Sequence, residues 1–166
     1  MFIKAKAGEG NTVEYSDVTE AIWIYSGGTR AWRNNNPGNI RSGEFATNHG
    51  AIGAAGGFAV FPDYETGKSA LQSLLKTSFY QELSISDAIT RYAPPVENNT
   101  ANYQATLKKL TGLPLEKKMN ALTDEELGKI VGAIQHIEGY HEGMVTRKIE
   151  PGKKESLPSV DIGTLR

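Results

Sequence analysis

The feature with the clearest catalytic potential is a glutamate at the end of an apolar helical stretch. Glu138 follows Ile134 and Ile137, which continue a stripe at helical spacing, and Gly139 comes directly after it. A carboxyl group in that place is shielded from water on one side, and the negative C-terminal end of the helix disfavours its charge. Both effects suit it to donate a proton to a leaving oxygen near neutral pH. An isolated Glu-Gly pair is more often an exposed helix end, so the rest of the sequence must decide.

An asparagine-rich stretch far from Glu138 offers groups that bind sugars. Residues 33–41 read Arg-Asn-Asn-Asn-Pro-Gly-Asn-Ile-Arg. The amides of Asn36 and Asn39 can donate to and accept from hydroxyl and N-acetyl groups, although such a composition also simply builds turns. Nearby arginines could hold a ligand carboxylate or stabilise the loop through backbone carbonyls. They are Arg30, Arg33 and Arg41.

A second polar and aromatic stretch covers residues 92–103. Tyrosine rings there can stack on pyranose faces, which makes the stretch a candidate wall of a sugar cleft. Asn99 or Thr100 can equally cap the helix that follows, and both interpretations can hold together. The candidate substrate-binding residues in this stretch are Tyr92, Glu97, Asn98 and Tyr103.

Composition excludes several classes of chemistry. The chain has no cysteine and three histidines, which excludes disulfides and thiolate metal sites and leaves no histidine cluster with zinc-ligand spacing. Eighteen Lys and Arg against nineteen Asp and Glu give a formal charge of −1, so there is no global basic field for nucleic acid or an anionic membrane. We therefore expect no cofactor or metal, no nucleic-acid partner and no membrane insertion.

Apolar spacing and turn residues predict the elements that must position these groups. Residues 1–33 alternate weakly, as in a short strand or hairpin, and residues 34–57 are rich in Asn and Gly, as in a lobe of loops and hairpins. A strand is expected over 58–61. Beyond Glu142 the chain turns to Pro, Gly, Lys and Ser and is expected as a mobile extension or a strap over the surface.

Four helices are expected after that strand, each with one apolar face. Asp63 can cap the first, and Thr123 with Glu126 forms a capping box at the start of the last. The expected helices follow Asp63, cover 86–92, run from Thr100 to Gly112 and extend from Thr123 to Glu138. The side chains expected to face inward are Ala70, Leu71, Leu74, Leu75, Ile85, Ala88, Ile89, Tyr103, Leu107, Leu110, Leu127, Ile130, Val131, Ile134 and Ile137.

Length and apolar content fit one globular domain with its own core. The chain has 166 residues, of which 39% are hydrophobic. We place a single domain at 1–149, with 1–33 as an N-terminal strand or hairpin extension and 150–166 as a flexible tail.

Over roughly residues 23–143 these features resemble a lysozyme-like family of peptidoglycan hydrolases, found in phage virion proteins and in antibacterial effectors of type VI secretion. The string Asn-Asn-Pro-Gly-Asn-Ile-Arg at 35–41 is the most specific part of the likeness. The chain is also similar, more distantly, to flagellar-type glucosaminidases, in which the corresponding tyrosine segment faces the sugar. The resemblance implies an α+β, mostly helical, lysozyme-like fold with a cleft β-hairpin lobe.

The chain departs from the family pattern at the catalytic helix. In lysozyme-like enzymes the catalytic glutamate ends the helix immediately before the cleft hairpin, whereas the segment before Asn34 reads as strand and turn. Glu20 is the only well-placed acid there, and it sits in no convincing helix. We therefore expect the acid-bearing helix on the C-terminal side, as in a circular permutation. Glu138 then becomes the general acid and must meet the asparagine string in space.

The partner of the acid stays open at this point. A glycosidase normally pairs its acid with a second carboxylate, for which Glu142, Glu44 and Asp63 are candidates. With a single acid the sugar's own 6-hydroxyl could attack, as in lytic transglycosylases. His49 and His141 are weaker candidates, because a lone loop histidine is more often structural or solvated.

The expected function is cleavage of peptidoglycan glycan strands, by a muramidase or a lytic transglycosylase that is an antibacterial effector or a phage-associated lysin. The alternative is a non-catalytic virion or secretion-apparatus protein that binds peptidoglycan. An amidase is disfavoured, because the chain has neither cysteine nor a paired-histidine zinc motif.

The start of the chain lacks the apolar segment of a signal peptide. We expect a monomer that is made in the cytoplasm and acts in the periplasm or cell wall of a target bacterium after delivery. Its expected partners are glycan strands, a delivery apparatus and, for an effector, an immunity protein.

Overall fold

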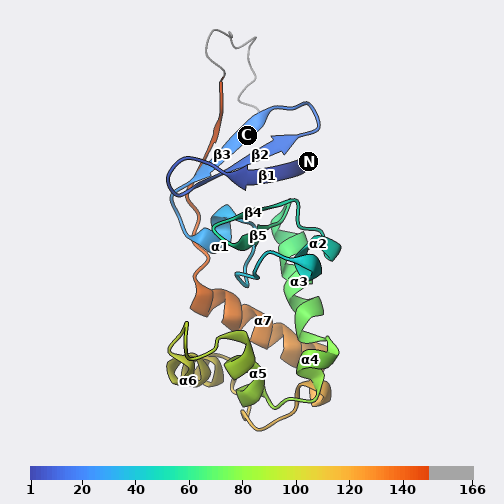
Figure 1. The fold of residues 1–166 in the computed structure, drawn as a ribbon. Coiled ribbons are helices and arrows are strands. Elements are labelled where there is room, and N and C mark those ends of the chain that lie inside the picture. Colours follow the sequence, from blue (N-terminus) through green and yellow to red (C-terminus); the bar gives the residue numbers. More distant parts are fainter. Residues whose placement is uncertain (150–166) are drawn as a thin grey trace.

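The protein has an α+β fold with three parts arranged one above another in the computed structural model, which describes residues 1–149. Figure 1 shows a sheet at the top, a small hairpin lobe in the middle and a group of helices below. The strands are β1 (Phe2–Ala7), β2 (Thr12–Asp17), β3 (Ile22–Ser26), β4 (Gly53–Ala55), β5 (Phe58–Val60) and β6 (Met144–Arg147). The helices are α1 (Arg30–Arg33), α2 (Glu44–Asn48), α3 (Tyr64–Leu75), α4 (Ser78–Gln81), α5 (Ile85–Tyr92), α6 (Thr100–Thr111), the 3-10 turn η1 (Met119–Ala121) and α7 (Asp124–Glu138).

The upper sheet joins the start of the chain to the segment that follows α7. Its strand order is β1-β2-β3-β6, and every neighbouring pair is antiparallel. The strands expected within residues 1–33 are confirmed. The segment beyond Glu142 forms a strand on β3 from Met144 to Arg147, so this part is a strap and not a mobile extension. The tail expected at 150–166 lies outside the described residues.

The sheet is tied to the hairpin lobe by buried aromatic side chains. Tyr15 is fully buried between Phe2 and Tyr25, with both ring centroids 4.6 Å away, and Tyr25 lies 4.9 Å from Trp32 of α1. The hydroxyl of Tyr15 donates to the carbonyl of Arg33 at 2.6 Å. These contacts hold the residues that follow α1 against the underside of the sheet.

The main core lies among the helices, where α7 packs against α3 and α6. The Asp63 carboxylate accepts from the backbone N–H of Thr66, which confirms it as the cap of α3. The four expected helices are all present, and the expected inward residues are buried or packed against the core with one exception. Leu110 is 47% exposed. The buried face of α6 consists of Thr100, Tyr103, Leu107 and Thr111, and Leu110 lies beside it. The short helices α1, α2, α4 and η1 were not expected, and α1 corrects the prediction of strand and turn for the segment directly before Asn34.

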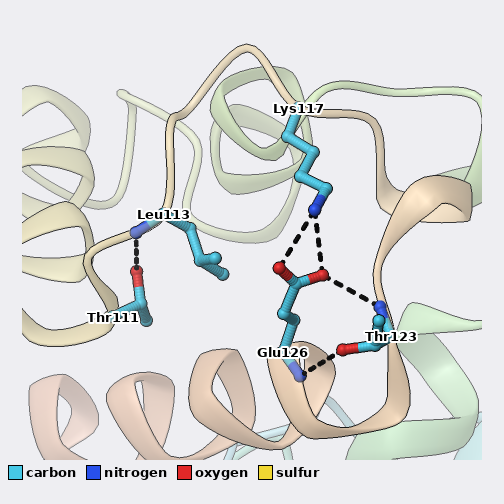
Figure 2. A network of polar contacts seen from close by, with 5 residues as sticks. All are labelled: Thr111, Leu113, Lys117, Thr123 and Glu126. Atoms are coloured by element: carbon cyan, nitrogen blue, oxygen red, sulfur yellow. Dashed lines mark hydrogen bonds and ion pairs between the residues drawn. The ribbon is translucent and has the colours of Figure 1, made fainter.

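The start of α7 is fixed by the expected capping box, which is confirmed (Figure 2). Thr123 Oγ1 accepts from the backbone N–H of Glu126 at 3.1 Å, and the Glu126 carboxylate accepts from the backbone N–H of Thr123 at 3.0 Å. Lys117 Nζ lies 3.0 Å from both carboxylate oxygens of Glu126. The loop before α7 is therefore attached to its first turn. Because α7 ends on Glu138, this attachment also sets where that side chain lies.

Replacing Glu126 by Gln should destabilise the protein in a pH-dependent way. The Thr123 backbone N–H and then Lys117 hold the pKa of Glu126 below its ordinary value. Its contribution is therefore fully present above the ordinary glutamate pKa and is lost as the pH falls through the lower folded-state value. Urea unfolding from about pH 3 to pH 7 should show a gap between wild type and variant that closes at the acidic end. The exposed Glu125→Gln is the matched control, and a gap that stays constant with pH would refute the role.

Candidate functional site

Glu138 is the last residue of α7, and its side chain is partly buried. Figure 1 shows that this end of α7 lies beneath the hairpin lobe. Glu138 Oε1 accepts from Asn39 Nδ2 at 2.9 Å, and its Oε2 accepts from the hydroxyl of Tyr103 at 2.8 Å. The expectation that the asparagine string and Glu138 meet in space is confirmed. Asn39 precedes Glu138 by 99 residues and Tyr103 precedes it by 35.

The chain turns sharply after Glu138 and is fixed again at once. Gly139 has φ +88°, a left-handed conformation that few side chains tolerate, and it ends the helix. His141 accepts from the backbone N–H of Thr29 at 3.0 Å, and its own N–H donates to Thr29 Oγ1 at 3.0 Å. The segment before α1 therefore holds the segment after α7. The backbone at Glu138 is thus fixed by α7 before it and by the Thr29–His141 hydrogen bonds after it.

Asparagines build the turn that brings Asn39 to the carboxylate. We call residues 34–39 the Asn turn. The side chain of Asn36 is fully buried, donates to the carbonyls of Ile40 and Ala59 at 2.9 Å each, and accepts from the backbone N–H of Ile40 at 3.0 Å. Asn39 adopts a left-handed backbone with φ 50°. Asn36 therefore has no surface for the sugar contact expected of it, because its amide is taken up by the backbone.

The two predicted tyrosines, Tyr92 and Tyr103, each donate a hydrogen bond at the site. The Tyr92 hydroxyl donates to the carbonyl of Gly38 in the Asn turn. Burial, together with the nearby Glu138 carboxylate, raises the pKa of both Tyr92 and Tyr103, so both remain neutral hydroxyl donors. The Tyr103 ring is only 5% exposed, so its faces pack inside the protein and are not available for stacking on a sugar. Its contact with Glu138 replaces the expected one.

The remaining predicted binding residues lie at an exposed rim. Arg41 and Glu97 form an ion pair of 2.8 Å between the hairpin lobe and the loop before α6, with side chains 60% and 51% exposed. Asn98 lies in the same exposed loop, and its Nδ2 is 3.5 Å from the carbonyl of Pro94. Sugar contacts by these three side chains stay a prediction.

The other candidate acids lie in different settings from Glu138. Asp63 is occupied in capping α3. Glu44 begins the exposed start of α2, and Glu142 is exposed after the helix has ended. Glu20 lies in the exposed turn between β2 and β3 with φ 69°. None of these four acids is among the hydrogen-bond partners of Glu138 within residues 1–149.

The histidine ring at position 49 has a local role. Its Nδ1 is 2.8 Å from the carbonyl of Phe45, and the ring stacks on Phe45 with centroids 4.0 Å apart. No group of three His, Cys, Asp or Glu side chains among residues 1–149 could hold a metal ion. No helix within that range is long and apolar enough to cross a membrane.

One aromatic contact beside the site was not predicted. The Tyr64 hydroxyl donates to Gln135 Oε1 at 2.7 Å, one turn before Glu138, and its ring meets that of Tyr140 edge-on at 5.3 Å. Burial, with smaller effects from Tyr64 and other neighbours, raises the pKa of Tyr140 to about 12. Tyr64 and Gln135 are 71 residues apart, and no motif linked them.

The geometry allows the Glu138 carboxyl to gain and lose a proton without losing its partners. A tyrosine hydroxyl can donate to a carboxylate and can accept from a protonated carboxyl group. Asn39 donates through Nδ2, while its Oδ1 is buried and has no partner within residues 1–149. A fixed amide donor on Oε1 and a hydroxyl that can donate or accept on Oε2 thus adjoin one ionisable group.

The Asn turn should depend on Asn36 for stability. In Asn36→Ala two carbonyls and one N–H lose their buried partner, which should cost more than about 3 kcal/mol. The exposed Asn98→Ala should change stability by less than about 0.5 kcal/mol. Chemical denaturation of both variants checks this, and equal effects would contradict the structural role of Asn36.

Comparison with known proteins places the chain beside a phage protein. No family model matches the chain. Protein P5 of Pseudoalteromonas phage PM2 is 30% identical over an alignment of 159 residues, and this alignment covers 92% of this chain and 92% of that protein. The chain therefore belongs to the family of protein P5 of Pseudoalteromonas phage PM2.

Proposed function

We propose that the protein cleaves the glycan strands of peptidoglycan, with Glu138 as the general acid. The observation that carries this proposal is the arrangement of its carboxylate at the end of α7. Asn39 holds one oxygen and Tyr103 holds the other, and Gly139 turns the chain away immediately afterwards. Two other elements thus fix the position of a helix-terminal carboxyl group, and a carboxyl group in a fixed position can protonate a leaving group that binds beside it.

The proposed reaction breaks the bond between an anomeric carbon and its glycosidic oxygen. Protonated Glu138 gives its proton to that oxygen as the bond breaks, and positive charge develops on the sugar ring. Either water or the sugar's own 6-hydroxyl then attacks the anomeric carbon, and the attacking group gives its proton to a carboxylate. Attack by water gives a reducing end, which is the reaction of a muramidase or a related hydrolase. Attack by the 6-hydroxyl gives an anhydro sugar and needs Glu138 alone.

Three further observations support a glycan of the cell wall as the substrate. Arg41 and Glu97 form the exposed rim next to the Asn turn, where hydroxyl and acetamido groups of a sugar chain could bind. A relative from a phage is compatible with a wall-cutting role, since a phage must cross the wall of its host. The resemblance of the Asn turn to lysozyme-like enzymes of phage virions and secretion systems points the same way.

Glu138→Gln is the direct test of the catalytic assignment. The amide keeps the size of the side chain and can still accept from Tyr103, but it cannot supply a proton. We expect a loss of at least about 100-fold in solubilisation of purified sacculi by a protein that is still folded, with a destabilisation limited to the loss of one of the two hydrogen bonds. Glu125→Gln on the exposed face of the same helix is the matched control. Retained activity in Glu138→Gln would exclude this residue and turn attention to Glu20 or Glu44.

Tyr103→Phe should lower kcat by about 10-fold, because Oε2 of Glu138 loses its hydroxyl donor. Tyr64→Phe is a matched control, since it also removes a hydroxyl that bonds to a side chain of α7. Both variants should lose about 1 kcal/mol of stability. Only the first should lose activity. Equal losses of activity would show that Tyr103 acts through stability alone.

A further inference from the structure

A pocket of about 370 Å³ lies between the N-terminal sheet and the hairpin lobe, apart from the Glu138 site. Its walls come from the turn between β1 and β2, from α1 and the residue after it, and from the turn between β4 and β5. The lining residues that carry the argument are Arg30, Arg33 and Asn34. Asn39, Tyr103 and Glu138 are not part of its lining, so the pocket needs its own explanation.

The wall of this pocket contains a buried amide without a partner. Asn34 is only 1% exposed, and its Nδ2 makes no hydrogen bond within residues 1–149. The next two asparagines are equally enclosed, but their Nδ2 groups each donate to two acceptors. A buried donor without a partner is rare in folded proteins and calls for an explanation. An acceptor atom on a ligand in the pocket would satisfy it after a rotation of the Asn34 amide, because Nδ2 itself is covered from solvent.

Two arginines give the same pocket a positive charge in fixed positions. Arg33 Nη1 donates to the carbonyls of Gly27 and Gly28 at 2.9 and 3.0 Å, which anchors its guanidinium. The guanidinium carbon of Arg30 lies 3.9 Å from the ring centroid of Phe58, which limits its movement. The lining contains no Asp or Glu. Of the nearest acids in the sequence, Glu14 is 3.5 Å from Lys148 and Glu9 is exposed.

We propose that this pocket binds a carboxylate group of a short peptide. A planar carboxylate matches the two-pronged donor of a guanidinium, and its second oxygen can accept from the Asn34 amide. The volume suits a small ligand group rather than a bare ion. On peptidoglycan this carboxylate belongs to the peptide that branches from the glycan, an assignment that rests on the proposed function. The pocket then recognises the peptide branch while Glu138 acts on the glycan.

The probe is N-acetylmuramoyl-L-alanyl-D-glutamic acid, and its fully amidated counterpart is the matched control ligand. Titration should move the side-chain amide signal of Asn34 in NMR spectra, and calorimetry should give an affinity at least about 10-fold higher for the acid than for the amide. Equal affinities for the two ligands would overturn the proposal. So would equally tight binding of inorganic phosphate, because the pocket would then be a general anion site.

Three variants separate the pocket from the fold and from catalysis. Arg30→Gln, at an exposed position, should weaken binding of the acid by about 10-fold, and Arg91→Gln on α5 should leave it unchanged. Asn34→Leu should weaken binding while the protein keeps or gains stability, because an unpaired buried amide is replaced by an apolar side chain of similar size. A marked loss of stability in Asn34→Leu, together with normal binding by Arg30→Gln, would contradict the assignment.

Glu138→Gln distinguishes this proposal from the proposed function. It should bind the acid probe as wild type does while it leaves sacculi intact. If wild type solubilises sacculi but does not bind the probe, the pocket assignment fails alone. If wild type binds the probe but leaves sacculi intact, the catalytic proposal fails and the peptide-carboxylate pocket stands.

Discussion

The two hydrogen bonds to the Glu138 carboxylate are the interaction around which the rest of the structure is arranged. One comes from Asn39 in the Asn turn and the other from Tyr103 on α6, so a single ionisable group joins the hairpin lobe, α6 and α7. Each donor is itself fixed by buried contacts. Asn36 holds the turn that carries Asn39, and the ring of Tyr103 is packed in the helical core. The position of the carboxylate is thus fixed by contacts with other parts of the fold, although a glutamate side chain is flexible by itself.

The N-terminal sheet contributes to this arrangement from outside the helices. β6 returns after α7 and pairs with β3, and Thr29 binds the backbone of His141 between them. Because both segments lead into the site, the sheet restrains the end of α7 as well as the start of the Asn turn. The same sheet forms one wall of the pocket that contains the unpartnered Asn34 amide. Residues 1–33, which the sequence predicts as an N-terminal extension, are therefore part of the framework that holds the site.

Local signals in the sequence predict most helices and strands, but they do not predict the hydrogen-bond partners of polar side chains. The cap at Asp63 and the capping box at Thr123 act within one turn of helix, so they could be recognised without knowledge of the fold. β6 was missed because all four of its residues are exposed and show no alternation. Asn36 was expected to face sugar, since composition cannot tell an amide that bonds to the backbone from one that faces solvent. The meeting of Asn39 and Glu138 was expected only through the family resemblance and the apolar helix that ends in Glu-Gly, because no local pattern spans 99 residues.

The central claim is that Glu138 protonates a glycosidic oxygen of peptidoglycan. Mass spectrometry of the soluble fragments released from purified sacculi by the wild-type protein tests it most directly. The account predicts fragments cut within the glycan, with anhydro-muramic ends for a transglycosylase, reducing muramic ends for a muramidase or reducing glucosamine ends for a glucosaminidase. Intact glycan strands with no fragments, or strands freed only of their peptides, would contradict it.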